Sequence, residues 1–424
     1  MASRSAWQGR GSGRAGGPLA ITRERPGPAM TRRVVVLGAG AAGLAAANGL
    51  GMHAGAGAEL EVVLIDRSGE HVFAPGFAAV LFGDAEPGAF RRPVSDLARP
   101  QVRVLAGEVT RLDPRASAVS GSFGELAYDH LVVALGADVG WRGDSPPGGD
   151  LAPWTLEGAL AGREELRRIR PGARVVVGPA GLAYRCPPAV FDLAARISRV
   201  TRARVDLVHP WPAPLAPFGR GPSAAFTAML AEAGVGFHGG FTIAQVTGDR
   251  VTSSGGAVLP YDAAFLVPPH HPPAAIAGSP LAGPSGWPAV SYPALTHPAH
   301  QDVTIIGDIA APALRAGMAG TLAVFQASHA ADRIAAPGSQ PGDPQMAAIC
   351  FADPGDAASF LYCDFTGPAA GTGPPKCVLM PPLRYFRQAK QLFAREWFTS
   401  MLTGDAGTAW LPLPAQPGAS RERQ

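Results

Sequence analysis

The stretch that decides the fold is Arg33-Val-Val-Val-Leu37 followed by Gly38-Ala-Gly40-Ala-Ala-Gly43. A run of apolar residues such as 34–37 is typical of a parallel strand buried on both faces. The glycines let the backbone approach a pyrophosphate closely, and an Ala- and Leu-rich helix over 44–50 would present unpaired N–H groups there. A second strand, Glu61–Ile65, ends at Asp66, an acid that can bond the hydroxyls of a ribose. This order of strand, glycine turn, helix, strand and acid predicts a dinucleotide-binding fold.

The composition fits a globular chain and excludes some functions. Its 424 residues allow two or three domains of about 100–200 residues each. A net charge of +3 gives no strongly basic surface, so nucleic acid is not an expected partner. The 54 glycines and 43 prolines, beside 47% hydrophobic residues, indicate tight turns in a folded chain. The 4 cysteines are too few for a disulfide scaffold and form no CxxC pair, so no metal site is predicted.

Two further segments contribute to the prediction. Tyr128–Ala137 is typical of a strand that ends in a turn of small residues, and Val303–Asp308 is typical of a strand that delivers a Gly-Asp pair. Both segments resemble the flavoprotein disulfide-reductase superfamily. In that superfamily the first segment closes the FAD domain, and the second places an aspartate on the ribityl chain of the flavin. The resemblance therefore implies FAD, held by Gly38, Gly40, Gly43, Asp66, Gly136, Gly307 and Asp308.

A second Rossmann-like domain is predicted between these segments, with a degraded nucleotide site. Ala173–Gly178 and Val205–His209 have the pattern of strands, with a helix over 189–197 between them. Two-nucleotide members of the superfamily carry a second GxGxxG for NAD(P)H here, whereas this chain has Gly178-Pro-Ala-Gly181. The glycine spacing is wrong, and the second strand ends at His209 without an acid for a ribose. NAD(P)H binding is therefore not expected at this turn.

Two segments carry a cysteine in a distinctive context, Tyr184-Arg-Cys186-Pro-Pro and Ile349–Asp356. The first resembles the Cys-Pro turn of the sulfide:quinone oxidoreductases and of the flavoprotein subunit of flavocytochrome c sulfide dehydrogenase. The second is similar to the Cys-x-x-Asp-x-Gly-Asp stretch of the sulfide:quinone oxidoreductases. The resemblance implies that Cys186 and Cys350 lie near the flavin as a disulfide or longer sulfur bridge, with Cys350 facing the flavin. Attack by hydrosulfide would give a persulfide on one cysteine and a thiolate on the other, which passes two electrons onward.

The chain departs from the best-known bacterial members of this group. Residues 138–170 contain no cysteine, although those enzymes carry a third one there, which leaves the growth and release of sulfur chains open. Residues 73–80 contain no cysteine where flavocytochrome c attaches its flavin, so non-covalent FAD is expected. Cys363, in an apolar strand-like run, and Cys377, after a Gly- and Pro-rich stretch, are expected to be structural.

The C-terminal segment predicts a basic amphipathic helix. Apolar residues recur at spacings of three and four from Phe386 to Met401, with basic residues on the other side. Such helices can lie in a membrane interface, and in the resembling family this region lies over the flavin and admits a quinone. The alternative is a helix that only covers the core. We expect peripheral attachment to the cytoplasmic face of the cell membrane, with quinone or membrane contacts from Phe386, Phe393 and Trp397.

Together the patterns predict an α/β fold with two Rossmann-like dinucleotide-binding domains of the disulfide-reductase type and a C-terminal segment with an amphipathic helix. The expected activity is FAD-dependent oxidation of sulfide to sulfur or polysulfide by Cys186 and Cys350, with a membrane quinone as acceptor. The expected parts are a disordered extension over 1–29, an FAD-binding domain over 30–137 and 295–335, a second domain over 138–294, and a redox-cysteine and quinone-facing region over 336–424.

Three alternatives stay open. A flavocytochrome-type subunit would pass electrons to a haem on another subunit, because this chain has no CxxCH. A type II NADH:quinone dehydrogenase has the same fold but needs the nucleotide motif that is degraded here. A flavin-free persulfide carrier or interaction protein would not need the glycine turn, Asp66 or Asp308. The sequence also leaves open whether a persulfide or thiol replaces sulfide, which acceptor is used, and whether the chain forms a homo-oligomer.

Overall fold

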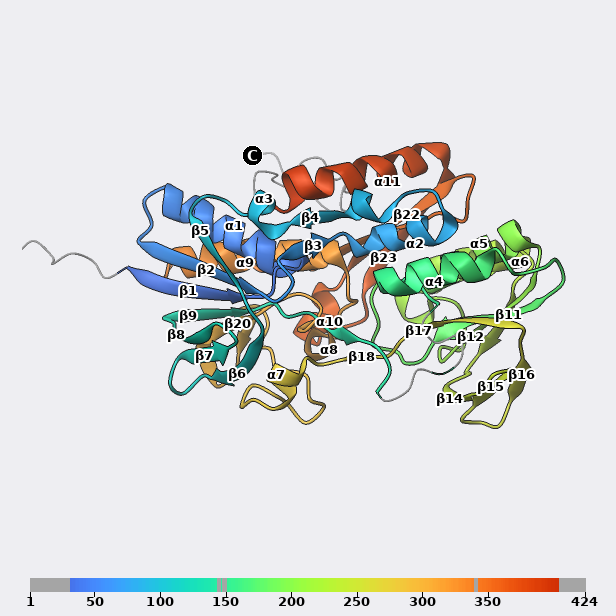
Figure 1. Ribbon diagram of the computed structural model, residues 1–424, viewed down its shortest axis with the longest axis horizontal. Helices are drawn as coiled ribbons and strands as arrows, with labels where there is room; N and C mark the ends of the chain where they lie inside the picture. Colours follow the sequence, from blue (N-terminus) through green and yellow to red (C-terminus); the bar gives the residue numbers. More distant parts are fainter. Residues whose placement is uncertain (1–30, 143–145, 147–150, 339–341, 404–424) are drawn as a thin grey trace, which may run out of the picture.

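The protein consists of two α/β units that lie side by side, with the C-terminal helix α11 (Arg384–Glu396) at the top of the view in Figure 1. The predicted extension over 1–29 lies outside the described residues. The computed structural model describes residues 31–142, 146, 151–338 and 342–403. The arrangement is the predicted α/β fold with two Rossmann-like cores.

The first unit is built on a six-stranded sheet in the order β19-β20-β9-β1-β2-β5. All neighbouring strands in it are parallel except β19 and β20. Residues 34–37 of the central strand are fully buried, as the apolar run predicts, and α1 (Ala41–Gly55) packs on β2 and against α9 (Gly320–Ala335). The strands are β1 (Arg32–Leu37), β2 (Leu60–Asp66), β5 (Val102–Ala106), β9 (His130–Val133), β19 (Thr296–His297) and β20 (His300–Ile305).

The second unit has a four-stranded parallel sheet in the order β13-β12-β11-β17. Helix α5 (Ala189–Thr201) connects β11 to β12 and continues past its predicted end at residue 197. In this additional turn, the hydroxyls of Ser198 and Thr201 are satisfied by donating to the carbonyls of Ala233 and Ile197. The other elements are β11 (Arg174–Pro179), β12 (Arg204–His209), β13 (Gly236–Gly239), β17 (Ala263–Val267), α4 (Leu156–Leu166), α6 (Arg220–Glu232) and the antiparallel β14 (Ile243–Val246), β15 (Arg250–Ser253) and β16 (Val258–Pro260).

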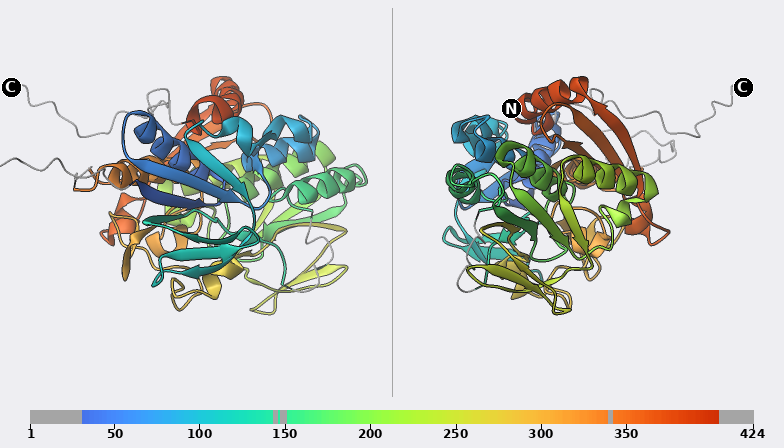
Figure 2. Two further views of the ribbon diagram at one scale, coloured as in Figure 1. Left: turned by 60° about the vertical axis from the view of Figure 1, so that its left-hand side comes forward. Right: turned by 90° about the vertical axis from the view of Figure 1, so that its right-hand side faces the viewer.

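A third, antiparallel sheet follows the two units and lies beneath α11 in the right-hand view of Figure 2. One of its faces contributes Phe360 to an apolar cluster with Phe325 of α9 and Phe386 of α11. The other face includes Cys350 and Cys363 and lines a cavity between the units. Its strands are β21 (Ala347–Ala352), β22 (Ala358–Asp364) and β23 (Lys376–Leu383).

Short elements complete the two units. Two small antiparallel sheets pair β3 with β4 and β10 with β18, and a third is formed by β6, β7 and β8. These elements are β3 (Glu70–Val72), β4 (Arg91–Pro93), β6 (Val109–Asp113), β7 (Ala118–Gly121), β8 (Gly124–Ala127), β10 (Asp138–Val139), β18 (His270–His271), α2 (Phe77–Phe82), α3 (Val94–Leu97), α7 (Ala274–Ala277), α8 (Ala311–Leu314) and α10 (Thr366–Ala370).

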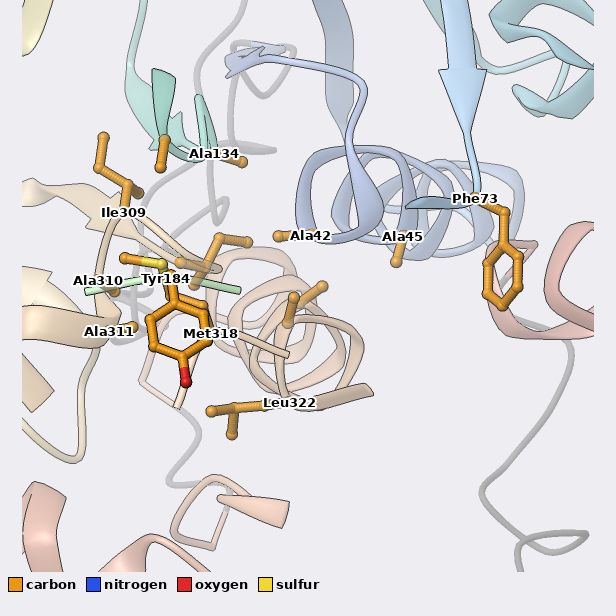
Figure 3. Close-up of a cluster of buried hydrophobic side chains, with 14 of the residues drawn as sticks. Ala42, Ala45, Phe73, Ala134, Tyr184, Ile309, Ala310, Ala311, Met318 and Leu322 are labelled. Carbon is orange, nitrogen blue, oxygen red and sulfur yellow. The ribbon is translucent and has the colours of Figure 1, made fainter. Parts of the chain in front are cut away.

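A buried apolar cluster joins the two units (Figure 3). Ala42 of α1, Ala134 after β9 and Met318 before α9 belong to the first unit, and Tyr184 comes from the β11–α5 loop of the second. Next to this cluster, the backbone N–H of Cys186 donates to the carbonyl of Met318 at 2.8 Å. The β11–α5 loop is thereby held against the first unit.

The apolar face of α11 and of the π-helical turn after it (Trp397–Met401) is turned into the protein. The exposed fractions of Phe386, Phe393 and Trp397 are only 5%, 8% and 3%. The prediction that these three residues contact a membrane is therefore wrong. The amphipathic pattern identifies an apolar face, and here the protein's own interior covers that face.

The outer side of α11 carries other apolar residues. Tyr385 and Leu392 are 60% and 52% exposed, beside basic residues of the same helix. Within the described ranges, no helix combines the length and the apolar character that a bilayer crossing requires.

Candidate active site

A cavity of about 1550 Å³ lies where the two units and the third sheet meet. Most of the residues that the sequence singles out line it, although they come from segments far apart in the chain. Gly43 is the exception among the predicted cofactor residues, and Phe386 does not line the cavity either. The predicted residues along its wall are Gly38, Gly40, Asp66, Gly136, Cys186, Gly307, Asp308, Cys350, Phe393 and Trp397.

The glycine turn after β1 has the geometry that close backbone approach requires. Gly38 has a φ of +90°, and a Cβ there would lie 2.7 Å from the carbonyl oxygen of Ala134. A Cβ on Gly43 would lie 1.8 Å from the carbonyl oxygen of Gly38, so this glycine permits the helix to pack on the turn. A Cβ on Gly40 would meet no atom within 4 Å, which leaves open space at the start of α1.

Asp66 fixes this turn from the end of β2. Its Oδ2 accepts a hydrogen bond of 2.8 Å from the N–H of Ala39, and its Oδ1 accepts from the N–H groups of Ser68 and Gly69 at 2.8 and 2.9 Å. The hydroxyl of Ser68 also donates to Oδ1, at 2.8 Å, so Oδ2, which among the described residues accepts only the bond from Ala39, is the oxygen that can accept another bond from the cavity. The acid found by its spacing therefore organises the turn as well as lining the site.

Asp308 has a partner that sequence reasoning missed. Its Oδ2 lies 3.0 Å from Nε of Arg185, and a guanidinium nitrogen of Arg185 also donates to the carbonyl of Ala137 at 2.9 Å. Burial raises the pKa of Asp308, and the arginine opposes that effect. The ion pair connects Asp308, which follows β20, to Arg185, the residue before Cys186. This position next to a predicted redox cysteine is the sequence signal that could have identified Arg185 as a site residue.

Cys186 and Cys350 meet in the cavity, although 164 residues separate them. Their Sγ atoms are 3.4 Å apart as free thiols in contact. Cys186 has a φ of +51°, a left-handed conformation that costs a side-chain-bearing residue about 1–3 kcal/mol. The hydrogen bond from its N–H to Met318 helps to hold that conformation. Strained backbone of this kind is concentrated at functional sites.

The surroundings of the two sulfurs differ. The hydrogen bond with Cys350 lowers the pKa of Cys186, and so does a bond from the N–H of Ala189 at the start of α5. The pKa of Cys350 is raised well above its ordinary value by the same contact and by burial. When the pair is reduced, the negative charge therefore resides on Cys186.

A charged group not found from the sequence lies beside the sulfur pair. Burial raises the pKa of Asp192, in the first turn of α5, to about 6, and its Oδ1 makes no hydrogen bond within the described part of the chain. Nearby, Nζ of Lys390 on α11 lies 3.3 Å from Oδ2 of Asp353. Asp192 can hold or release a proton near neutral pH next to the sulfurs.

His71 connects the glycine turn to the end of α11. Its Nδ1 is 2.8 Å from the carbonyl oxygen of Ala39, to which it donates, and its Nε2 accepts a bond of 2.9 Å from the indole N–H of Trp397. Burial lowers the pKa of His71, which favours the neutral ring that this pattern requires.

The turn after β11 lacks what a second nucleotide site needs. At the end of β12, His209 is fully buried, where it contacts the hydroxyl of Tyr184 at 3.0 Å and accepts from the N–H of Trp211. Burial lowers the pKa of His209 to about 4, so the ring is neutral. No carboxylate ends this strand, and the loop instead brings Cys186 to the cavity.

The comparison with known families agrees with this geometry. The sequence profile of the pyridine nucleotide-disulphide oxidoreductase family matches residues 32–267, which is more than half of the chain. The chain belongs to this family. It is therefore an oxidoreductase, and this pyridine nucleotide-disulphide oxidoreductase has the flavoprotein fold that the sequence predicts.

Solved structures share the fold of this oxidoreductase. The sulfide:quinone oxidoreductase of the hyperthermophilic bacterium Aquifex aeolicus is 19% identical with a TM-score of 0.75, over 88% of this chain and 92% of that one. A putidaredoxin reductase in covalent complex with putidaredoxin is 20% identical with a TM-score of 0.61, over 86% and 93%. An NAD-dependent persulfide reductase from A. fulgidus is 19% identical with a TM-score of 0.57, over 80% and 66%. At these identities the three comparisons show a shared fold and nothing further.

The residues along the cavity fit the FAD that the family implies. The open space at Gly40 faces the start of α1, where a pyrophosphate would meet backbone N–H groups. Asp66 and Asp308 supply carboxylates for ribose and ribityl hydroxyls, and the volume of the cavity is ample for a dinucleotide. In the described ranges, no cluster of His, Cys, Asp and Glu is placed to hold a metal ion.

Proposed function

We propose that the protein oxidises sulfide through a disulfide between Cys186 and Cys350, with non-covalently bound FAD as the first electron acceptor. The observation that supports this most strongly is the 3.4 Å contact between the Sγ atoms of Cys186 and Cys350 on the wall of the cavity. Cys186 lies in the turn after β11, which carries no nucleotide-binding motif. A disulfide is the electrophile that hydrosulfide attacks most readily.

The thiolate preference of Cys186 suggests the direction of the reaction. The thiol with the lower pKa is the better leaving group. Hydrosulfide therefore attacks Sγ of Cys350, the S–S bond breaks, and the products are a Cys350 persulfide and a Cys186 thiolate. A second hydrosulfide attacks the outer sulfur of the persulfide, which releases HSSH and leaves Cys350 as a thiolate. The pair has then gained the two electrons that the substrates lost.

When bound, FAD would supply a two-electron acceptor for this pair, and the loss of the two electrons re-forms the Cys186–Cys350 disulfide. Gly38, Gly40 and Gly136 would hold the FAD from the backbone, and Asp66 and Asp308 from their carboxylates. No cysteine lies in residues 73–80, which supports non-covalent binding. The resemblance assigns the flavin-facing role to Cys350, whereas the pKa directions favour Cys186 as the thiolate that donates electrons.

Asp192 and Lys390 assist the sulfur chemistry. The Asp192 carboxyl can take the proton of an incoming hydrogen sulfide, because its pKa is about 6. The Lys390 ammonium lowers the pKa of both cysteines through space, which favours the thiolates formed at each step.

We propose a membrane quinone as the final acceptor. Phe393 and Trp397 line the cavity and offer aromatic surface to a quinone ring. The outer side of α11, with Tyr385, Leu392 and its basic residues, supports peripheral binding to an anionic membrane surface on the cytoplasmic side. Replacing Leu392 and the exposed Arg384 with Glu should abolish sedimentation with anionic lipid vesicles, and unchanged sedimentation would rule out this face.

Anaerobic titration with sulfide tests the proposed chemistry. We expect sulfide to bleach the blue absorption of the oxidised flavin in the wild-type protein, and Cys186→Ser and Cys350→Ser to slow this about a thousandfold. Dithionite should still bleach both variants, which shows that their flavin is bound and reducible. Rapid bleaching by sulfide in either variant would contradict the proposal.

A further inference from the structure

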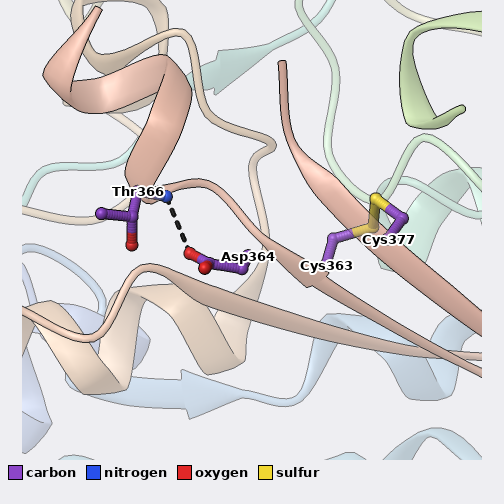
Figure 4. The surroundings of a disulfide bond; sticks show 4 residues. All are labelled: Cys363, Asp364, Thr366 and Cys377. Atoms are coloured by element: carbon purple, nitrogen blue, oxygen red, sulfur yellow. Dashed lines mark hydrogen bonds between the residues drawn. A yellow bond between two sulfur atoms is a disulfide. The ribbon is translucent and has the colours of Figure 1, made fainter. Parts of the chain in front are cut away.

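The two remaining cysteines form a disulfide that spacing did not predict. Cys363 on β22 and Cys377 on β23 are directly paired across the two strands, with their Cα atoms 4.1 Å apart (Figure 4). The neighbouring Asp364 accepts a bond of 2.8 Å from the N–H of Thr366, which fixes the strand end.

This disulfide lies on the same face of the sheet as Cys350. In the register of β21 and β22, Cys350 is opposite Leu361, and Ala348 is opposite Cys363. Alternate residues of a strand share one face, so Cys350 and Cys363 are diagonal neighbours on that face. Diagonal neighbours have Cα atoms roughly 7–8 Å apart. A disulfide spans Cα atoms about 4.4–6.8 Å apart, so a bond between Cys350 and Cys363 requires the backbone of the two strands to move together by about 1 Å.

The two sulfurs of the disulfide differ in access. Cys363 is 1% exposed and lines the same cavity as Cys186 and Cys350. Cys377 is partly exposed and lies on the far side of Cys363 from β21. From the surface inward, the four cysteines therefore follow one another in the order Cys377, Cys363, Cys350 and Cys186.

We propose that Cys363–Cys377 is a second redox-active disulfide, through which a small thiol in solution reduces the Cys186–Cys350 disulfide. The proposal rests on the redox role of Cys186 and Cys350 given above.

The exchange balances in four steps. A thiolate RS⁻ attacks Cys377, forms a mixed disulfide with it and frees Cys363 as a thiolate. Cys363 attacks Sγ of Cys350 and displaces Cys186, the better leaving group. A second RS⁻ attacks the sulfur of R in the mixed disulfide, which releases RSSR and frees Cys377. Cys377 then attacks Cys363, re-forms the outer disulfide and frees Cys350. Two thiolates have become RSSR, and their two electrons lie on the Cys186–Cys350 pair, which would pass them to FAD when the cofactor is bound.

Trapping the central bond tests the proposal without any use of sulfide. The variant Cys186→Ser/Cys377→Ser keeps only Cys350 and Cys363, and mild oxidation should link them in most of the protein. The matched variant Cys186→Ser/Cys363→Ser keeps Cys350 and Cys377, which stand two strands apart, and should stay unlinked. Non-reducing peptide mass spectrometry distinguishes the two results. Absence of the link in the first variant, or an equal link in both, would overturn the proposal.

The wild-type protein provides a second test that does not depend on the variants' folding. After brief exposure to a limiting amount of glutathione, followed by acid quenching and alkylation, we expect a peptide that joins Cys350 to Cys363. Finding only the Cys363–Cys377 and Cys186–Cys350 links would contradict the relay.

A rate ratio separates this proposal from the proposed function. Cys377→Ser should reduce the ratio of glutathione-driven to sulfide-driven flavin reduction by about tenfold or more. An unchanged ratio would overturn the relay while leaving sulfide oxidation intact. Absence of sulfide-driven reduction in the wild-type protein, together with a trapped Cys350–Cys363 bond, would instead overturn the proposed function alone.

Discussion

The two Rossmann-like units have the same strand-turn-helix arrangement and different chemistry at the turn. In the first, residues 38–40 lead from β1 to α1, whose first helical turn contains Gly43, and Asp66 ends the next strand. In the second, residues 180–188 lead from β11 to α5, and His209 ends the next strand. The first turn leaves open space beside the backbone of Gly40, whereas the second places the sulfur of Cys186 in the cavity. Topology fixes where a ligand binds, and the turn residues decide which ligand it is.

The largest expected effect comes from filling the first turn. In Gly43→Ala, the new methyl group would lie 1.8 Å from the carbonyl of Gly38, so the helix must move away from the turn. We expect the purified protein to lose its flavin absorption and about 1–3 kcal/mol of unfolding free energy.

Gly181→Ala is the matched control in the second turn. A Cβ on Gly181 would meet no atom within 4 Å, so this variant should keep its flavin and change the unfolding free energy by about 0.5 kcal/mol or less. If both variants lost the flavin, or both kept it, the claim that only the first turn binds the cofactor would be contradicted.

Asp192 tests the buried charge beside the second turn. Burial raises the pKa of Asp192 from 3.8 to about 6, so the folded state favours its protonated form. The resulting stability is fully present below pH 3.8 and is lost as the pH rises through about 6. Asp192→Asn should therefore increase the unfolding free energy at pH 8 by about 2–3 kcal/mol. Denaturant titrations should show this gain disappear at pH 3.5 or below, whereas a gain independent of pH would exclude a titrating carboxyl as its cause.

The smallest expected effect concerns the contact between the first turn and the end of α11. Trp397→Phe leaves Nε2 of His71 buried without its indole donor, which should reduce the unfolding free energy by about 1 kcal/mol. A double-mutant cycle with His71→Phe isolates the bond, and a coupling energy near zero would show that it adds no stability.

The sequence patterns alone predicted the features formed by residues close together in the chain, but not the contacts between residues far apart in it. The first turn was readable because its strand, glycines, helix and Asp66 are local and follow fixed spacings. The Cys186–Cys350 contact rested on a resemblance, since no local pattern links residues 164 positions apart. The Arg185–Asp308 pair depends on how the two units pack, and periodicity does not encode that.

The C-terminal segment shows a different limit. The apolar period predicted the helix, but whether its face meets lipid or protein depends on the third sheet, which buries Phe386 against Phe360. The Cys363–Cys377 bond likewise depends on strand register, which becomes visible only when β22 and β23 are paired.

The most direct test of the central claim compares two reductants on the wild-type protein. Under anaerobic conditions, stopped-flow absorbance should show sulfide reducing the flavin at least about a hundredfold faster than the same concentration of NADH. That result would support a redox disulfide in place of a nucleotide site at the second turn. Reduction by NADH at an equal or higher rate would contradict it, because a working nicotinamide site would then be present.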